Sequence, residues 1–210
     1  MKIAVLGSGR IGGALAKKWA RAGHTITFGS RDPDKPELKE LLKTLGGGAT
    51  ATNAGAAIHA SEVVLFAIPG ATMAESIIEH AKVLDGKILI DAANNMAGHT
   101  LNSFATFAEQ TPKAQVFRAF NNYGWEDFEN ADFAGGPADL FYCGPDGSAR
   151  ATVEHLIQEV GLNPLYIGGV EHVDLVDAVL RLWITLIRER NMGRHLAFKV
   201  LTDAPSSQAG

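Results

Sequence analysis

Three glycines near the N-terminus have the spacing of a phosphate-binding turn. Gly7, Gly9 and Gly12 form the pattern G-x-G-x-x-G, and an apolar run precedes them. Between a strand and a helix, the first glycine permits a tight turn and the second lets the backbone approach a pyrophosphate. The third lets the helix pack closely on the strand, and the unpaired N–H groups at the helix start hold the phosphates. The motif predicts a dinucleotide site, with a ligand-free glycine turn as the alternative.

The end of the second predicted strand indicates which dinucleotide would bind. NAD-binding proteins commonly place an acidic residue about twenty residues after the glycines, where it bonds the ribose 2′-OH. Here Ser30 and Arg31 stand at this place, and Lys35 adds a further positive charge. A hydroxyl and a guanidinium suit a 2′-phosphate, which arginine can bind with two parallel hydrogen bonds. We therefore predict NADP(H). In the alternative, Arg31 is a solvated surface residue, and Asp32, one position further along the chain, is the acidic residue that bonds the ribose 2′-OH.

Short apolar runs and helical patterns alternate along the chain and would position these motifs. The runs Ile3–Leu6, Val63–Ile68 and Ile88–Ile90 do not alternate with polar residues, which is typical of strands buried on both faces of a parallel sheet. Helical patterns follow the glycine motif and begin again at Pro36. We expect an α/β fold, a Rossmann-type doubly wound, mainly parallel sheet.

The pattern changes after a further predicted strand, Gln115–Asn121. Residues 121–137 are predicted to form a loop, and one or two long helices are predicted over His172–Leu201, interrupted near 191–193. Between these segments we expect a helix flanked by two strands: Leu140–Cys143, Ser148–Val160 and Pro164–Ile167. We expect three parts: an NADP-binding Rossmann domain at 1–144, a small C-terminal helical or α+β domain at 145–204 that closes a cleft, and a flexible tail at 205–210.

The bulk composition limits the classes of function. The 210 residues are 46% hydrophobic and carry a formal net charge of −4, which gives no attraction to nucleic acid or anionic membranes. No apolar run reaches the ~20 residues of a membrane span. Cys143 is the single cysteine, so no intrachain disulfide can form, which suits a reducing compartment. We expect a cytoplasmic protein that binds neither nucleic acid nor membrane.

The sequence shows no acid–base, nucleophilic or metal centre. The seven histidines are scattered, without an H-E-x-x-H pattern, and each is expected at the surface rather than as a ligand. Cys143 lies in an apolar run and is expected to be an inert buried thiol. Hydride transfer from a nicotinamide to a flavin-like ring needs close stacking and exclusion of water, not a strong acid or base. We therefore expect neither a metal nor a catalytic side chain.

Over nearly its whole length the chain resembles the NADPH-dependent reductases of the deazaflavin coenzyme F420. The resemblance rests on the glycine loop and on four further segments: Gly29-Ser30-Arg31, Val64–Pro69, Ala119-Phe120-Asn121 and Asn191-Met192-Gly193. It implies hydride transfer in a cleft between a Rossmann domain and a small C-terminal domain. It also implies residue roles: Ser8, Gly9, Arg10 and Ile11 at the pyrophosphate, Ser30, Arg31 and Lys35 at the 2′-phosphate, Ile68, Pro69 and Thr72 along the cofactor, and Ala119 near the nicotinamide.

The chain departs from the family pattern at two places, which leaves the acceptor more open than the cofactor. Archaeal members have a longer glycine loop, Gly-Gly-Thr-Gly-Asn-Leu-Gly, and differ also at Arg118–Asn121. A fold-mate of the family reduces ordinary flavin within a membrane ferric reductase, so FMN and FAD are alternative acceptors. We expect Asn191, Met192 and Gly193 to wall the acceptor on one side, because a glycine within an apolar helix suits a close approach, and Ile68-Pro69 and Ala119-Phe120-Asn121 to form the opposing wall. A simple kink or a dimer contact at 191–193 is the alternative.

Two other functions remain open from the sequence. One is a dehydrogenase of the imine or β-hydroxyacid type, which needs a large helical domain; only about 65 residues follow Gly144. The other is a non-catalytic NADPH sensor, which would keep the glycine loop and Ser30–Arg31 but lack an open acceptor cleft. The apolar stripe that precedes Met192 belongs either to the core or to a dimer face, so a homodimer is also an expectation.

Overall fold

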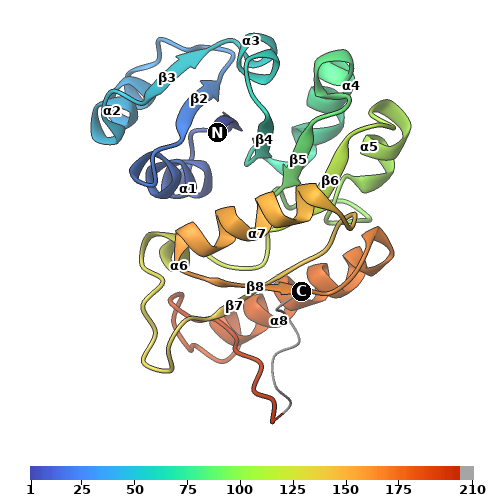
Figure 1. The fold of residues 1–210 in the computed structure, drawn as a ribbon. Helices are drawn as coiled ribbons and strands as arrows, with labels where there is room; N and C mark the ends of the chain where they lie inside the picture. Colours follow the sequence, from blue (N-terminus) through green and yellow to red (C-terminus); the bar gives the residue numbers. More distant parts are fainter. Residues whose placement is uncertain (204–210) are drawn as a thin grey trace.

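Six parallel strands form the central sheet of the computed structural model (Figure 1). The structure describes residues 1–203, so the tail predicted at 205–210 lies outside the described residues. The strands are β1 (Lys2–Leu6), β2 (Thr25–Gly29), β3 (Ala49–Thr52), β4 (Val63–Phe66), β5 (Ile88–Asp91) and β6 (Gln115–Arg118). Their order, β3-β2-β1-β4-β5-β6, is that of a Rossmann fold, which confirms the predicted doubly wound sheet.

Helices cover both faces of this sheet. One face carries α1 (Arg10–Arg21), α2 (Pro36–Leu45) and α7 (Ser148–Val160), and the other carries α3 (Ala54–His59), the short 3-10 helix η1 (Gly70–Thr72), α4 (Met73–Leu84) and α5 (Phe104–Gln110). Side chains along β1 alternate between the two cores, with Ile3 and Val5 in one and Ala4 and Leu6 in the other. This double burial explains the uninterrupted apolar runs of the sequence.

A second sheet of two parallel strands lies beside the first. The strands β7 (Asp139–Tyr142) and β8 (Asn163–Tyr166) pair with each other and flank α7, as predicted. The segment predicted as loop at 121–137 contains one short helix, α6 (Trp125–Glu129). An antiparallel bridge between Arg118 and Cys143 links the two sheets. The domain boundary at Gly144 stays a prediction, since β7 on one side of it pairs with β8 on the other.

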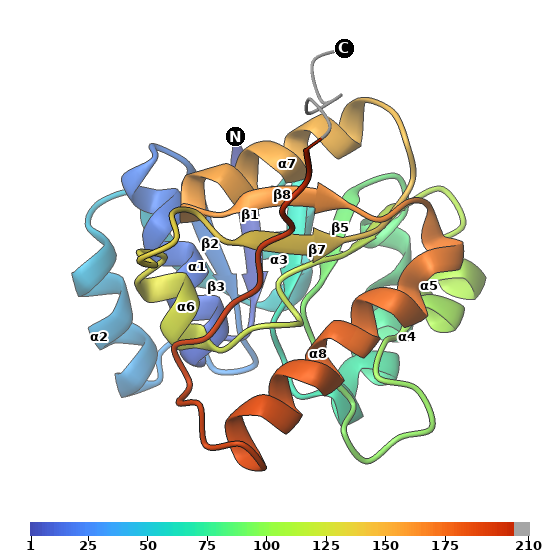
Figure 2. The same cartoon turned by 90° about the horizontal axis from the view of Figure 1, so that it is seen from below.

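The helix expected over His172–Leu201 is shorter than predicted. After the 3-10 helix η2 (Val170–His172), α8 spans Val173–Arg188, and residues 189–203 are not helical. Asn191 and Gly193 have φ of 54° and 81°, the left-handed region in which a helix does not continue. We call residues 191–203 the C-terminal strap. It runs back past β7 and β8, where Asp139 N donates to Phe198 O at 2.9 Å (Figure 2).

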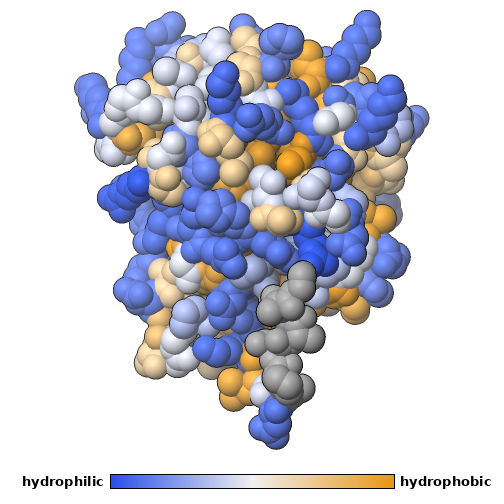
Figure 3. Space-filling view, viewed as in Figure 1, coloured by the Kyte–Doolittle hydropathy of each residue, from blue (hydrophilic) through white to orange (hydrophobic). Residues whose placement is uncertain are grey.

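The face of the molecule seen in Figure 1 is mostly polar. Seen from the side of Figure 1, hydrophilic residues cover most of the molecule and apolar residues form small patches among them (Figure 3). None of the helices within residues 1–203 combines the length and apolar character needed to cross a membrane.

Candidate functional site

The carboxyl ends of the central strands meet at one edge of the sheet. The register places Leu6 beside Gly29 on one side and beside Phe66 on the other. The strand order reverses between β1 and β4, because β2 continues from one side of β1 and β4 lies on the other. In open α/β sheets, ligands bind outside the carboxyl ends of the strands at such a reversal.

Two glycines of the loop after β1 are required by close backbone contacts. Gly7 has a φ of 110°, and a Cβ on it would lie 2.3 Å from Ala67 O. A Cβ on Gly12 would lie 2.0 Å from Gly7 O, so this glycine lets α1 approach the end of β1. Neither position can take a side chain without movement of the backbone.

Gly9 differs from these two glycines because the space next to it is open. A Cβ on Gly9 would meet no atom within 4 Å. Gly9 is also the N-cap of α1, and the first turn of that helix contains no acidic residue. The first N–H groups of an α-helix have no partner within the helix, so they are available for an anion. Open space and free donors therefore coincide at this position.

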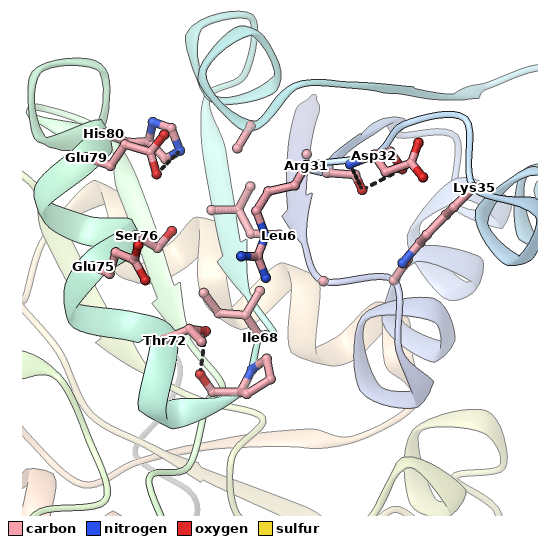
Figure 4. Close-up of a pocket in the computed structure, with 16 residues that line it drawn as sticks. Leu6, Arg31, Asp32, Lys35, Ile68, Thr72, Glu75, Ser76, Glu79 and His80 are labelled. Carbon is pink, nitrogen blue, oxygen red and sulfur yellow. Dashed lines mark hydrogen bonds and ion pairs between the residues drawn. The ribbon is translucent and has the colours of Figure 1, made fainter.

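A cavity of about 340 Å³ lies between the ends of β1 and β2 and the helix α4 (Figure 4). It brings together eight of the predicted cofactor residues: Gly7, Ser8, Ser30, Arg31, Lys35, Ile68, Pro69 and Thr72. The remaining predicted cofactor residues, Gly9, Arg10, Ile11, Gly12 and Ala119, are not among those that line it. Gly9 to Gly12 lie at the start of α1, and Ala119 is fully buried.

Arg31 and Lys35 supply the positive charge of this cavity. In Figure 4 the Arg31 side chain extends across the opening towards α4, and Lys35 lies on the same side as the Arg31 backbone. The Asp32 carboxylate instead accepts a hydrogen bond from Asp34 N at 3.1 Å. The Ser30 hydroxyl donates to Asp32 O at 2.9 Å and so stabilises the turn. Asp32 also lines the cavity, but in Figure 4 its carboxylate points away from α4, whereas the guanidinium extends towards that helix.

The opposite wall is formed by one side of α4. Residues at spacings of four contribute to it: Thr72, Ser76 and His80, and likewise Glu75 and Glu79 (Figure 4). Only Thr72 is among the residues predicted from the sequence. The others could have been found from the same spacing, because residues four apart share one face of a helix.

The residues predicted for the acceptor cleft lie in two different surroundings. Phe120 and Asn121 are buried, and Phe120 packs edge-on against Trp19 and Phe128 with ring centroids 5.7 Å apart in each case. The stretch Asn191–Gly193 is exposed, at the start of the strap. None of these residues lines the cavity in Figure 4, and the acceptor cleft stays a prediction.

A buried charge network lies at the same edge of the sheet and was not predicted. Arg118 is fully buried at the end of β6, and its Nη1 lies 3.1 Å from Asp91 Oδ1 at the end of β5. Its Nε donates to Asp177 Oδ1 of α8 at 2.8 Å. Asn121 Nδ2 donates to the same oxygen at 3.2 Å, and Arg118 Nη2 donates to Asn94 Oδ1 at 2.7 Å. The network attaches α8 to the ends of β5 and β6.

Cys143 lies beside this network and is buried, as expected. Burial raises the pKa of its thiol to about 12, although Arg118 acts in the opposite direction. Because the thiolate is the nucleophilic form, this cysteine is unreactive at neutral pH.

Comparison with known proteins agrees with this geometry. Residues 2–95 match the family model described as NADP oxidoreductase, coenzyme F420-dependent. A solved structure from Arthrobacter sp. FB24, itself assigned only provisionally as an F420-dependent NADP-reductase, superimposes with a TM-score of 0.82 at 26% identity. The superposition covers 96% of this chain and all of the other.

Two curated proteins are related at lower coverage of their own length. The metalloreductase STEAP3 of Rattus norvegicus is 28% identical over 187 residues, which are 85% of this chain and 36% of that protein. The glycerol-3-phosphate dehydrogenase [NAD(P)+] of Azotobacter vinelandii is 26% identical over 125 residues, which are 54% of this chain and 37% of that protein. The chain thus spans little more than a third of the length of these relatives.

The family match covers β1 to β5 and therefore includes the glycine loop, the turn with Ser30 and Arg31, and the α4 wall of the cavity. The structural match extends over almost the whole chain, including the segments after β6. Over residues 2–95 the chain matches the F420-dependent NADP oxidoreductase family, and over almost its whole length its fold is that of the Arthrobacter structure.

Proposed function

We propose that the chain is an NADP(H)-dependent oxidoreductase that transfers a hydride between the nicotinamide and a deazaflavin, coenzyme F420, or a flavin-like acceptor. The observation that carries the preference for NADP(H) is the pair of cations at the end of β2. Arg31 and Lys35 line the cavity, and the Asp32 carboxylate is engaged by Asp34 N. A 2′-phosphate in this part of the cavity gains two cationic partners, whereas one oxygen of the Asp32 carboxylate, the acceptor that a 2′-OH would use, is already bonded to Asp34 N.

The rest of the cofactor fits the same cavity and the adjoining helix start. The pyrophosphate would lie at Gly9, where the backbone leaves space and α1 offers its first N–H groups. Ser8, Arg10 and Ile11 flank this point, and Gly7 and Gly12 shape the turn. Ile68, Pro69 and Thr72 would border the cofactor on the side of β4. Ala119, at the end of β6, would lie nearest the nicotinamide.

Removal of the guanidinium tests the choice of dinucleotide. Arg31→Ala loses a charge-assisted contact to the 2′-phosphate, at a cost of about 1.5–3 kcal/mol, or roughly ten- to a hundredfold in affinity. We expect calorimetric titration to show this loss for NADPH and almost no change for NADH. Arg21→Ala, at the exposed end of α1, is the matched control and should change neither affinity. Equal weakening of both dinucleotides by Arg31→Ala would contradict the assignment.

Two acceptor classes follow from the relatives. The family model names coenzyme F420, which favours the deazaflavin. The match to a metalloreductase covers 85% of this chain and supports a flavin or ferric reductase as the second candidate. Neither acceptor needs an acid or base from the protein, because hydride transfer depends on stacking and on exclusion of water.

The acceptor can be identified by the rate of NADPH oxidation, followed at 340 nm. We expect coenzyme F420 to support oxidation, and FMN, FAD and ferric citrate are tested in parallel with the same protein. Activity with a flavin or ferric citrate but not with F420 would select the metalloreductase-like alternative. Tight NADPH binding without oxidation by any of the four would leave the NADPH sensor as the function and contradict the proposed enzyme.

A further inference from the structure

A second cluster of polar side chains lies at the opposite edge of the sheet from the cofactor cavity. His24 directly precedes β2, and His155 and Glu159 lie on α7. Glu159 Oε2 is 2.7 Å from His24 Nε2, and Glu159 Oε1 is 3.0 Å from His155 Nε2. One potential ligand atom of each residue lies within 4.8 Å of those of the other two. Two imidazole nitrogens and one carboxylate therefore converge on one point.

The surrounding structure holds the cluster in place. His155 and Glu159 are four residues apart on α7, so they share one face of that helix. His24 N donates to Trp19 O at 3.0 Å, and Trp19 Nε1 donates to Leu156 O at 3.0 Å. The end of α1 is thus fixed against the turn of α7 that carries His155. Little rearrangement is needed to bring the three side chains around a common ligand.

Burial differs among the three side chains in a way that suits an accessible site. The side chains of His24 and Glu159 are 7% and 14% exposed, whereas that of His155 is 57% exposed. The expectation that every histidine lies at the surface is therefore wrong for His24. The Nδ1 atom of this ring lies 3.0 Å from the nitrogen of Met1, and Nε2 faces Glu159. An ion bound at Nε2 leaves the ring proton on Nδ1, which then donates to the Met1 nitrogen as a neutral amine, so binding of the ion releases one proton. An ion can enter from the side of His155, while His24 and Glu159 provide fixed ligands.

We propose that His24, His155 and Glu159 bind a divalent transition-metal ion, with zinc as the best match to the donor set. Zinc takes imidazole nitrogen at about 2.0–2.1 Å and carboxylate oxygen at about 2.0–2.2 Å, commonly with three protein ligands and a water molecule. Magnesium and calcium prefer all-oxygen sites. The two contacts of Glu159 need to lengthen by a few tenths of an ångström around a tetrahedral ion, and the exposed His155 can move inwards.

The position of the site implies a structural effect. The ion would connect the turn before β2 with α7. His24 and Glu159, which belong to these two segments, are 135 residues apart in the sequence. It would thereby attach α7, which lies between β7 and β8, to the first half of the central sheet. A ligand that binds only the folded chain raises its stability by mass action. Zinc should therefore raise the unfolding temperature.

Calorimetric titration of zinc chloride into the chelator-treated, full-length chain at pH 7.5 tests the proposal. We expect one zinc ion per chain, and at least about tenfold weaker binding in His155→Ala and in Glu159→Gln. Both substitutions are modest: the first is at an exposed position and the second preserves the size of the side chain. The matched control is His59→Ala, an exposed histidine at the end of α3, which should bind zinc as the parent does.

Two further measurements distinguish a built site from adventitious binding. Zinc should raise the unfolding temperature of the parent and of His59→Ala, and leave that of the two site variants nearly unchanged. Circular dichroism without metal should show that all four proteins are folded. The absence of stoichiometric zinc binding in the parent, or equal affinity in parent and site variants, would overturn the proposal. In that case Glu159 serves only as a hydrogen-bond acceptor for the two imidazoles.

Discussion

Asp127 is a buried carboxyl group with few partners. It lies in α6 and is fully buried, and no side chain donates a hydrogen bond to its carboxylate oxygens. Burial raises its pKa to about 7, and the neighbouring Glu126 carboxylate acts in the same direction. The backbone N–H groups of Gly124 and Leu196 act to lower the pKa, and so does Arg194 of the strap; His195 Nε2 lies 4.0 Å from Oδ1. Near neutral pH this carboxyl is therefore partly protonated.

Asp127 makes the stability of the fold depend on pH. In the unfolded chain its pKa returns to about 3.9, so between about pH 4 and pH 7 the folded state holds a proton that the unfolded state has lost. The free energy of unfolding contributed by this group therefore falls as the pH rises through that window. We expect Asp127→Asn to remove this slope: urea unfolding should show a variant close to the parent at pH 4 and more stable at pH 8.

The control for this substitution is Asp132→Asn, because Asp132 is an exposed residue just beyond α6. Its carboxyl is not buried, so the variant should retain the pH dependence of the parent. An Asp127→Asn protein whose stability declines with pH as steeply as that of the parent would show that the carboxyl is ionised in the folded state.

Residues at the cofactor site could be predicted from sequence because their roles depend on local geometry. Gly12 is required by a contact within one strand–turn–helix, and Arg31 stands in the turn just after β2. The pairing of Arg118 with Asp177 could not be predicted, because the two are 59 residues apart and belong to different elements. A buried charge is recognised only when the packing around it is known. An arginine within the apolar run Val116–Phe120 was the available signal.

At the scale of elements, α1 shows how the position of a glycine decides its role. Gly12 and Gly13 are adjacent and both buried in the same helix. A Cβ on Gly12 would lie 2.0 Å from the backbone oxygen of Gly7, whereas one on Gly13 would lie 3.6 Å from the side chain of Leu41. The second contact is an ordinary van der Waals distance. The two positions are therefore a matched pair with opposite expectations.

We expect Gly13→Ala to raise the free energy of unfolding by about 0.5–1 kcal/mol, because alanine loses less backbone entropy than glycine in a helix. We expect Gly12→Ala to lower it, since α1 must move away from β1, and to weaken NADPH binding as the glycine loop shifts. Chemical denaturation and NADPH titration of the two variants check both effects. A Gly12→Ala protein as stable as Gly13→Ala, with unchanged NADPH affinity, would contradict the role given to this contact.

The segment after α8 shows where a periodic pattern misleads. Leu196, Ala197 and Phe198 pack against the larger core, so apolar residues continue beyond Arg188 although the helix does not. Trp183 Nε1 donates to Leu196 O at 2.7 Å, a contact made by an extended strap rather than by a helical turn. The spacing of apolar residues indicates which side chains are buried. An extended strap that folds back against its own helix can bury such side chains as well as a continued helix would.

For the whole molecule, the last strand of the Rossmann sheet is one point of attachment for the second sheet and for α8. Arg118 bridges to Cys143 of the segment after β7 and pairs with Asp177 of α8. The exposed side of α8 carries Leu175 and Leu182, 56% and 50% exposed. These leucines are available for a contact with a second copy, and the homodimer stays a prediction. Both this contact and the predicted closure of the cleft by the C-terminal domain would need α8 to be firmly attached to the central sheet.

Asp177 is the residue through which this attachment can be tested. Its Oδ1 accepts from Arg118 Nε at 2.8 Å, and its Oδ2 accepts from Asn102 Nδ2 at 2.8 Å. Asp177→Ala would leave the guanidinium buried with only Asp91 as a charged partner, and loss of one member of a buried ion pair costs about 3–5 kcal/mol. We expect urea denaturation to show a loss of this size, whereas Asp174→Ala, one turn earlier on the exposed side of α8, should change stability by less than about 0.5 kcal/mol. Similar effects of the two substitutions would show that α8 is held by its apolar face alone.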